Sequence, residues 1–193
     1  MTSAELENVG ERAFREAIGH FATGVTVITT LHEGAPAGMT ASAVASLSVD
    51  PILLLVCINH KLPTHHAIDA SQRFVVNVLG EGQGDLALHF AQPSADKFAA
   101  VALRDGHDLP VLDRAIAYFV CDVHERFPGG DHSIFVGRVR ACGAVPNRRP
   151  LVYYRSKFGS LQDRHKDLVS EAVGWDVASL GGLSNIQFSV EHD

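Results

Sequence analysis

Small hydroxyl side chains alternate with small apolar ones between residues 37 and 49, and this pattern could place a ligand against the backbone. We expect the segment to form one strand. Its two faces would carry, respectively, Thr40, Ser42, Val44, Ser46 and Ser48, and Met39, Ala41, Ala43, Ala45 and Leu47. Because the side chains are small, a flat molecule could lie close to the strand backbone and accept hydrogen bonds from its N–H groups. A half-exposed strand without a ligand would show the same pattern.

A phosphate-binding corner at residues 59–64 is the second candidate. Asn59 ends a predicted strand, Lys61 follows it, and Thr64 is expected to cap a short helix that runs to Ala70. A hydroxyl group, an ammonium group and the positive end of a helix dipole would together attract a phosphate group.

The third candidate is the sequence Gly130-Asp131-His132, which opens the return strand of a predicted hairpin. Asp131 could simply bond to the backbone of the turn. His132, just past the turn, could instead donate a hydrogen bond to an amide or a phosphate group of a ligand. The aromatic residues between 154 and 158 are expected to pack within the protein more readily than to contact a ligand.

Other chemical motifs are incomplete. In the glycine-rich stretch 80–85, Asp85 replaces the third glycine of a dinucleotide-binding fingerprint, and its charge would repel a pyrophosphate. No HExxH pair occurs, and the adjacent His65 and His66 would point to different sides of a helix, so we expect no metal site. Cys57 lies in an apolar run and is expected to be a buried, unreactive thiol. No acid and base are spaced as a catalytic pair.

The framework that must position these residues is predicted to be mainly β with peripheral helices. Phe14, Ile18 and Phe21 follow helical spacing, and Gly24 is expected to end that helix. Strands are expected at 25–31, 37–49, 52–58 (buried on both faces), 74–79, 115–127, 133–145 and 151–154, and further helices at 64–70, 85–91, 95–101 and 162–172. Pro128-Gly129-Gly130 would turn the two long strands into a hairpin. Because long crossover helices are missing, we expect about six antiparallel strands closed into a barrel.

Composition narrows the class of protein. The chain has 193 residues, of which 46% are hydrophobic and 20% charged, which suits one globular domain and excludes disorder as its main state. The net charge of -6 argues against nucleic acid or an anionic membrane as a partner. The longest apolar run, 52–58, is too short to span a bilayer, and no signal peptide is expected. Three cysteines without a CxxC spacing indicate a reducing, cytoplasmic location.

Taken together, six stretches of the chain resemble the flavin reductase family, the short-chain, split-barrel NAD(P)H:flavin oxidoreductases that serve two-component monooxygenases. The matching stretches are residues 14–30, 38–51, 53–64, 73–79, 96–101 and 130–139. They follow the family's order between about residues 12 and 161. We therefore expect a flavin reductase-like domain over residues 1–161 and a C-terminal extension of uncertain structure over residues 162–193.

What the resemblance implies is a six-stranded antiparallel split β-barrel of the FMN-binding type. It would form a homodimer with flavin near the subunit interface. The flavin-binding residues that it implies are Met39, Thr40, Ala41, Ser42 and Ala43 along the ring, Ser46 near the ribityl chain and phosphate, Cys57, Ile58 and Asn59 on the neighbouring strand, Lys61 and Thr64 at the phosphate, and Phe158 near the ring. The implied nicotinamide-binding residues are Asp131 and His132.

The implied activity is the reduction of free FMN or FAD by NADH or NADPH, with hydride transfer from nicotinamide C4 to flavin N5 and delivery of reduced flavin to a partner oxygenase. Because the two cofactors carry this chemistry, no acid or base side chain is required. Leu62 stands where the family commonly has serine, which leaves FMN and FAD both open. The alternatives are a flavin-binding protein without activity, a relative of pyridoxamine-phosphate oxidase or of deazaflavin reductases, and a histidine-rich metal or haem barrel.

Overall fold

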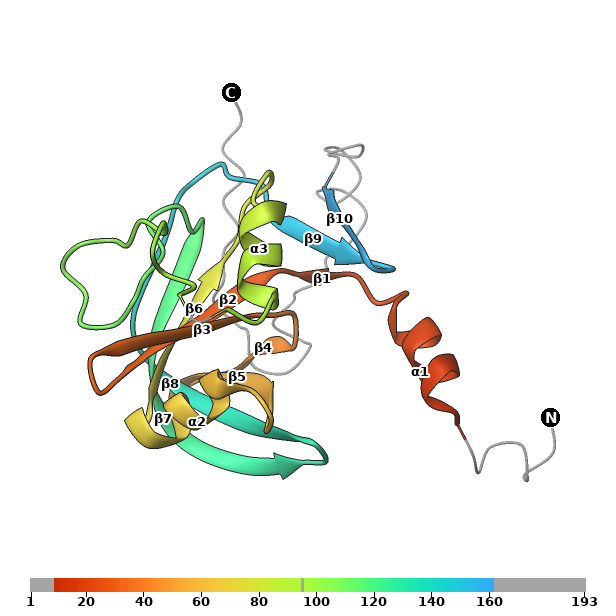
Figure 1. The fold of residues 1–193 in the computed structure, drawn as a ribbon, viewed down its shortest axis with the longest axis horizontal. Helices are drawn as coiled ribbons and strands as arrows, with labels where there is room; N and C mark the ends of the chain where they lie inside the picture. Colours follow the sequence, from red (N-terminus) through yellow and green to blue (C-terminus); the bar gives the residue numbers. More distant parts are fainter. Residues whose placement is uncertain (1–8, 95, 162–193) are drawn as a thin grey trace.

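Antiparallel strands dominate the structure, a computed structural model that describes residues 9–94 and 96–161 (Figure 1). The helices are α1 (Glu11–Ile18), α2 (Pro63–Ser71) and α3 (Gly84–Ala91). The strands are β1 (Thr23–Gly24), β2 (Thr26–His32), β3 (Ala35–Ala41), β4 (Val44–Val49), β5 (Ile52–Asn59), β6 (Arg73–Val78), β7 (Ala117–Gly129), β8 (His132–Ala144), β9 (Leu151–Tyr154) and β10 (Lys157–Ser160). The predicted mainly β class is confirmed, with ten strands in the described residues where about six were expected.

Seven strands form the main sheet in the order β3-β2-β6-β7-β8-β5-β4, and a smaller sheet joins β1, β9 and β10. The edges of the main sheet, β3 and β4, are separated in the chain by Ser42 and Ala43 alone. So short a link spans only about 10 Å. The sheet must therefore curl until its two edges meet, which produces the predicted barrel.

The prediction of one continuous strand over 37–49 is wrong. The chain leaves β3 after Ala41, where the Thr26 hydroxyl donates to the Ala41 carbonyl at 2.7 Å, and it enters β4 at Val44 on the opposite edge of the sheet. Alternating small residues carry no signal for such a change of partner strand. The hydroxyl groups expected on one face are consequently distributed over two strands and the link between them.

Two smaller expectations are also corrected. β5 was expected to be buried on both faces, but burial alternates: Leu54, Val56 and Ile58 are buried, whereas the side chains between them are partly exposed. The barrel has its core on one side of this strand only. Thr64 does not cap α2, because Pro63 occupies the first helical position and the residue before it makes no side-chain capping bond.

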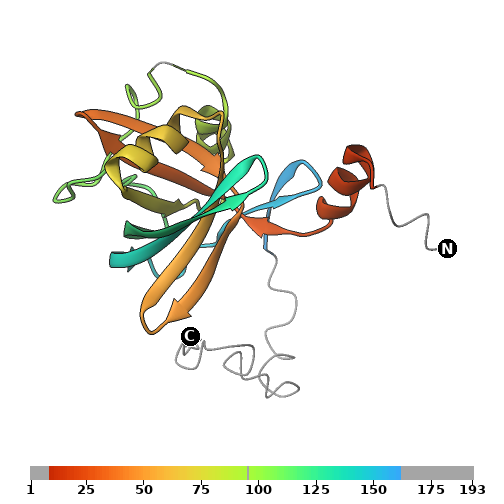
Figure 2. The ribbon, with the colours of Figure 1, turned by 90° about the horizontal axis from the view of Figure 1, so that it is seen from below.

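The first helix is shorter than expected and stands away from the barrel (Figure 2). α1 ends at Ile18 with Gly19 as its C-cap, whereas Gly24, the predicted stop, pairs with Val152 between β1 and β9. No residue of α1 is buried. Its apolar stripe therefore lacks a partner within the described chain.

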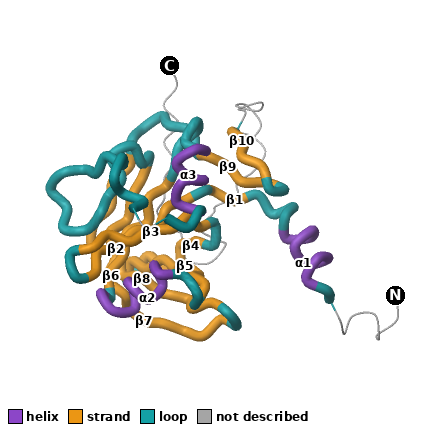
Figure 3. The backbone as a smooth tube through the Cα atoms, viewed as in Figure 1, coloured by secondary structure: helices purple, strands orange, loops and turns teal. Residues whose placement is uncertain are grey.

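The segment between α3 and β7 is mostly loop (Figure 3). The helix predicted at 95–101 is not found: residues 97–100 form a turn, and residue 95 lies outside the described part of the chain. Lys97 holds the turn in place by donating to the carbonyls of Phe90 at 2.7 Å and Gly38 at 3.2 Å. The helix predicted at 162–172 also lies outside the described residues.

The long hairpin is confirmed, and its turn consists of Gly130 and Asp131. Gly130 has a φ of 70°, which suits glycine at the first position of a two-residue hairpin turn. Beneath the hairpin, the core is built from buried side chains such as Phe74 and Phe135. No helix in the described ranges is long and apolar enough to cross a membrane.

Candidate functional site

A groove of about 820 Å³ lies where α1, the β3–β4 link, β5 and β9 approach one another. Its size is within the range of about 300–1,000 Å³ that is common for ligand sites. Residues from each of these parts line it, among them Arg15, Ser42, Ala43, Cys57 and Tyr153. Segments far apart in sequence thus build one open and mainly apolar hollow.

The β3–β4 link supplies the groove with free backbone donors. Ser42 and Ala43 are exposed, and no hydrogen-bond partner is found for their N–H groups within the described residues. The carbonyl of Ala43 accepts a bond from the Cys57 N–H at 3.0 Å, which fixes the link to β5. A ligand with carbonyl or imine acceptors could bond to both N–H groups without displacing a protein partner.

Only some of the residues expected along a flavin ring face this groove. Ser42, Ala43 and Cys57 line it, but Ala41 and Ile58 are buried in the core cluster and the partly buried Met39 packs against that cluster. The Thr40 hydroxyl points elsewhere and donates to the Ala87 carbonyl of α3 at 2.6 Å. Partial burial raises the pKa of the Cys57 thiol, in keeping with the expected unreactive side chain.

Asn59, Asp131 and His132 come together at the end of β5. Asn59 pairs with His132 in the sheet, and its amide donates to the Asp131 carboxylate at 3.1 Å. The His132 Nδ1 lies 2.7 Å from the other carboxylate oxygen. An ionised carboxylate only accepts, so Nδ1 carries the proton and Nε2 remains available to a ligand. The bond from His132 keeps the pKa of Asp131 below its usual value.

A second group of polar side chains adjoins Asp131 and His132, and the sequence analysis did not predict it. Ser133 is buried, and its Oγ lies 3.1 Å from Nε2 of His60 and 2.9 Å from Nε2 of His65. The sequence showed His65 only as one of two adjacent histidines on a helix. The contact depends on the register that pairs Ile58 with Ser133, and no local pattern encodes that register.

The remaining predicted residues lie apart from the groove. Lys61 is exposed, whereas Thr64 is only 3% exposed, so the two do not present one phosphate-binding surface in this chain. Ser46 is exposed on β4 and does not line the groove. Phe158 lies on β10 with its ring centroid 5.8 Å from that of Tyr153, which does line the groove.

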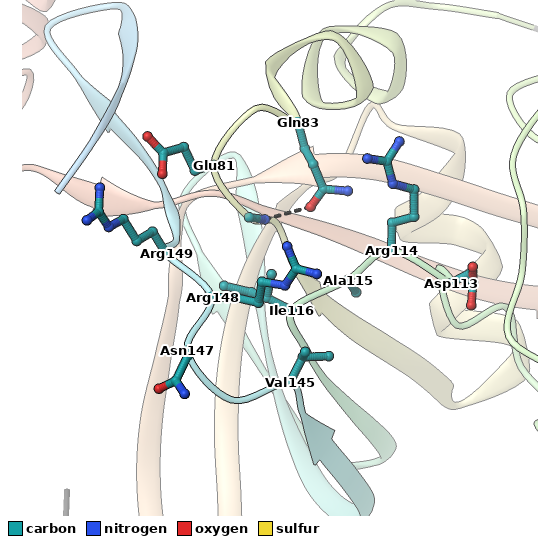
Figure 4. A pocket seen from close by; sticks show the side chains of 11 residues that line it. Glu81, Gln83, Asp113, Arg114, Ala115, Ile116, Val145, Asn147, Arg148 and Arg149 are labelled. Atoms are coloured by element: carbon teal, nitrogen blue, oxygen red, sulfur yellow. Dashed lines mark hydrogen bonds between the residues drawn. The ribbon is translucent and has the colours of Figure 1, made fainter. Parts of the chain in front are cut away.

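A separate hollow of about 520 Å³ lies beside the loop that precedes α3 (Figure 4). Arginines dominate its wall, with Arg114, Arg148 and Arg149 around Gln83. The Gln83 side chain is fixed by the Gly80 N–H, which donates to its Oε1 at 2.6 Å. None of the predicted site residues lines this hollow. Elsewhere, no group of three or more histidine, cysteine or acidic side chains in the described residues could hold a metal ion.

Comparison with known proteins identifies the family to which this geometry belongs. Residues 18–162 match the model of the flavin reductase like domain, and they contain the whole barrel and the groove-forming link. The chain belongs to the flavin reductase family. It is therefore an oxidoreductase, and the flavin reductase fold accounts for the curled antiparallel sheet described above.

Individual relatives agree with this assignment. The reductase component of a 4-nitrophenol 4-monooxygenase/4-nitrocatechol 2-monooxygenase from Rhodococcus opacus is 47% identical over 154 residues, covering 80% of this flavin reductase and 83% of the relative. A solved NADH:FAD oxidoreductase from Streptomyces globisporus, in complex with NAD and FAD fragments, is 34% identical with a TM-score of 0.76, covering 82% of this chain and 99% of that one. The styrene monooxygenase flavin reductase from Pseudomonas putida S12 is 33% identical with a TM-score of 0.72, covering 77% and 97%.

Proposed function

We propose that this flavin reductase transfers a hydride from NADH or NADPH to FMN or FAD, and that the groove at the β3–β4 link holds the flavin ring. One observation carries the proposal: Ser42 and Ala43 offer two N–H groups that lack partners within the described chain, on the wall of a hollow of ligand size. An isoalloxazine ring presents carbonyl and ring-nitrogen acceptors that match these donors. Larger side chains at Ser42 and Ala43 would block the ring from reaching these N–H groups.

The nicotinamide coenzyme would bind next to the flavin, at Asp131 and His132. Asn59, which bonds to Asp131, lies two residues beyond the groove residue Cys57 on β5. Alternation along a strand places these two side chains on one face, about 7 Å apart. His132 can therefore reach a coenzyme that lies over a ring in the groove.

The flavin and the nicotinamide supply the hydride acceptor and donor of this reaction. The residues of the chain hold the two molecules in a reactive orientation, which is the larger part of the catalytic task in such a transfer. The free N–H groups of the link would also stabilise negative charge that develops near the bonded edge of the ring. No side chain needs to accept or release a proton during the transfer.

A partner oxygenase would receive the reduced flavin. Two of the similar proteins described above carry the names of monooxygenase reductase components, which supports such a role for this chain. All three cysteines, Cys57, Cys121 and Cys142, are free thiols, which supports a reducing, cytoplasmic location for the exchange.

A homodimer would cover the apolar face formed by α1 and the turn that follows it. Phe14, Ile18 and Phe21 are 57%, 52% and 70% exposed, and such an apolar stripe is uncommon on a monomer. Ile18 and Phe21 also line the groove, so a second copy packed on this stripe would help to enclose the flavin. The stripe therefore supports a flavin site close to the subunit interface.

A spectrophotometric assay tests the proposed activity. Purified protein is mixed with NADH or NADPH and with FMN, FAD or riboflavin, and loss of nicotinamide absorbance is followed in all combinations. We expect flavin-dependent oxidation, with one coenzyme and one flavin preferred. The second candidate function, flavin storage, would instead give flavin binding by equilibrium dialysis without any coenzyme oxidation.

A further inference from the structure

The contact that joins the buried Ser133 and His65 to the exposed His60 has no part in the reaction as proposed, yet it adjoins the coenzyme-binding pair. Ser133 follows His132 directly, and His60 donates its backbone N–H to the Asp131 carbonyl at 3.1 Å. The two imidazoles reach the same hydroxyl from two elements: His60 follows β5, and His65 lies on α2. The contact thus links α2 to the hairpin turn through one oxygen atom.

The number of available protons makes this link depend on neutral imidazoles. Each imidazole uses its Nε2, and the Ser133 hydroxyl has one proton to give. The hydroxyl proton finds an acceptor within this contact only when one ring accepts it, while the other ring donates to an Oγ lone pair. The Nδ1 of His65 is buried and has no partner within the described residues. A proton on that nitrogen would be a buried N–H without an acceptor, which is costly. The arrangement that avoids this cost has His65 donating to Ser133 and Ser133 donating to His60.

The surroundings of His65 also oppose its charging. Its side chain is buried against the ring of Phe135, with centroids 5.3 Å apart. Burial is the main cause that lowers the pKa of His65, and the nearby His60, His66 and Arg126 act in the same direction. Asp69 alone among the facing groups raises that pKa, and its carboxylate is already paired with Arg126.

We propose that His65 is a positioning residue for the nicotinamide coenzyme, acting through Ser133 to hold the Asp131–His132 turn in its binding geometry. His65 does not touch the coenzyme. Its neutral imidazole fixes the Ser133 hydroxyl, and Ser133 fixes the first residues of β8. Protonation of His65 destabilises this arrangement, because the cation would bring a second, buried N–H that has no acceptor within the described residues. This inference rests on the proposed role of the turn in coenzyme binding.

Three variants test the inference with the full-length protein. His65→Phe keeps the ring but removes both nitrogens, so we expect the KM for NADH to rise about 5- to 10-fold, the loss of one hydrogen bond, with little change in kcat or in flavin affinity. His65→Gln keeps an amide that can reach Ser133 but does not titrate, so it should restore the KM at pH 7.5. His66→Gln is the matched control, since His66 is exposed and its ring contacts His65 rather than Ser133.

The pH profile separates positioning from a general structural effect. In the wild type, the KM for NADH should rise only at a pH below about 6.5, the ordinary pKa of histidine, because burial keeps the folded His65 neutral to a lower pH. That rise should be weaker in His65→Gln and retained in His66→Gln, where it should begin at a slightly higher pH because His66 helps to lower the pKa of His65. Equal KM values and equal pH profiles in His65→Phe, His66→Gln and the wild type would overturn the inference. So would a parallel loss of flavin affinity and kcat in His65→Phe.

Two controls keep the outcome interpretable. If His65→Phe does not fold, Ser133→Ala removes the same contact from the other side and should give the same KM increase; a wild-type KM in that variant would also refute the inference. If the wild type oxidises no coenzyme, the proposed function fails instead. The inference is then judged by hydrogen exchange at residues 130–133, which should be faster in Ser133→Ala than in His66→Gln.

Discussion

At the scale of single residues, His132 and Ser42 are predicted to serve different molecules, so substitution should separate their effects. His132→Ala removes the Nε2 that we propose binds the coenzyme and releases the Asp131 carboxylate from its partner. We expect the KM for NAD(P)H to rise about 10-fold, the equivalent of one charge-assisted hydrogen bond. The dissociation constant for flavin should stay within about two-fold of the wild type, by fluorescence titration. An equal loss of flavin binding would contradict the assignment.

Ser42 gives the complementary prediction. Ser42→Leu places a branched side chain at the edge of the groove, where it would crowd a ring that lies against the link. We expect flavin affinity to fall by at least about 10-fold, measured by the same titration. Ser94→Leu is the matched control, since Ser94 is also exposed but does not line the groove. Normal flavin binding by Ser42→Leu would exclude the link from the site.

His65 makes the stability of the fold depend on pH. Its pKa is lower in the folded chain than in the unfolded chain, mainly because it is buried. As the pH falls below about 6.5, the unfolded chain binds a proton that the folded chain refuses, so the free energy of unfolding decreases. The slope contributed by one such group approaches about 1.4 kcal/mol per pH unit. Urea unfolding between pH 7.5 and 5.5 should show a shallower decrease for His65→Gln than for the wild type.

At the scale of elements, the close approach of a β6 side chain to the backbone of β8 depends on a glycine. A Cβ at Gly137 would lie 2.4 Å from Cζ of Phe74 and 2.9 Å from Cβ of Cys121, both in the core. Gly137→Ala should therefore destabilise the protein by about 1–3 kcal/mol, seen as a lower urea midpoint. Gly159→Ala, on β10, meets no atom within 4 Å and serves as the control. Equal urea midpoints for the two variants would contradict this prediction and show that the core side chains shift to accommodate a Cβ at position 137.

The same elements show how much of the fold can be predicted from the sequence alone. Strands with strong apolar or β-branched patterns, such as β2 and β6, and the hairpin with its glycine turn were predicted because local residues encode them. The division of residues 37–49 into β3 and β4 was not predicted, because the change of partner strand at Ser42–Ala43 is a property of the curled sheet. Of the residues predicted along the ring, Ala41 is therefore buried in the core and Met39 packs against it, while the link itself lines the groove.

At the scale of the whole molecule, one side of the described chain exposes apolar side chains beside the groove. The stripe on α1 is exposed, the groove beside it is open, and the exposed Tyr153 and Phe158 lie in the adjoining small sheet. Burial of such side chains contributes about 1.5–3 kcal/mol each. In the proposed homodimer, a second copy of the chain would bury them on both molecules at once through a two-fold contact. The flavin site and the dimer contact would then lie on the same surface of the chain.

This dependence can be tested by charging the stripe. Phe14→Glu combined with Ile18→Glu should convert a dimer into a monomer in analytical ultracentrifugation, because carboxylates at both positions would be buried without partners. Flavin affinity should fall in the same variant, since Ile18 lines the groove and α1 would lose its support. Glu16→Gln, on the opposite face of α1, should leave both properties unchanged. A monomeric variant with wild-type flavin affinity would show that a single chain completes its own site, and the groove would then have to bind the ring without help from a partner copy.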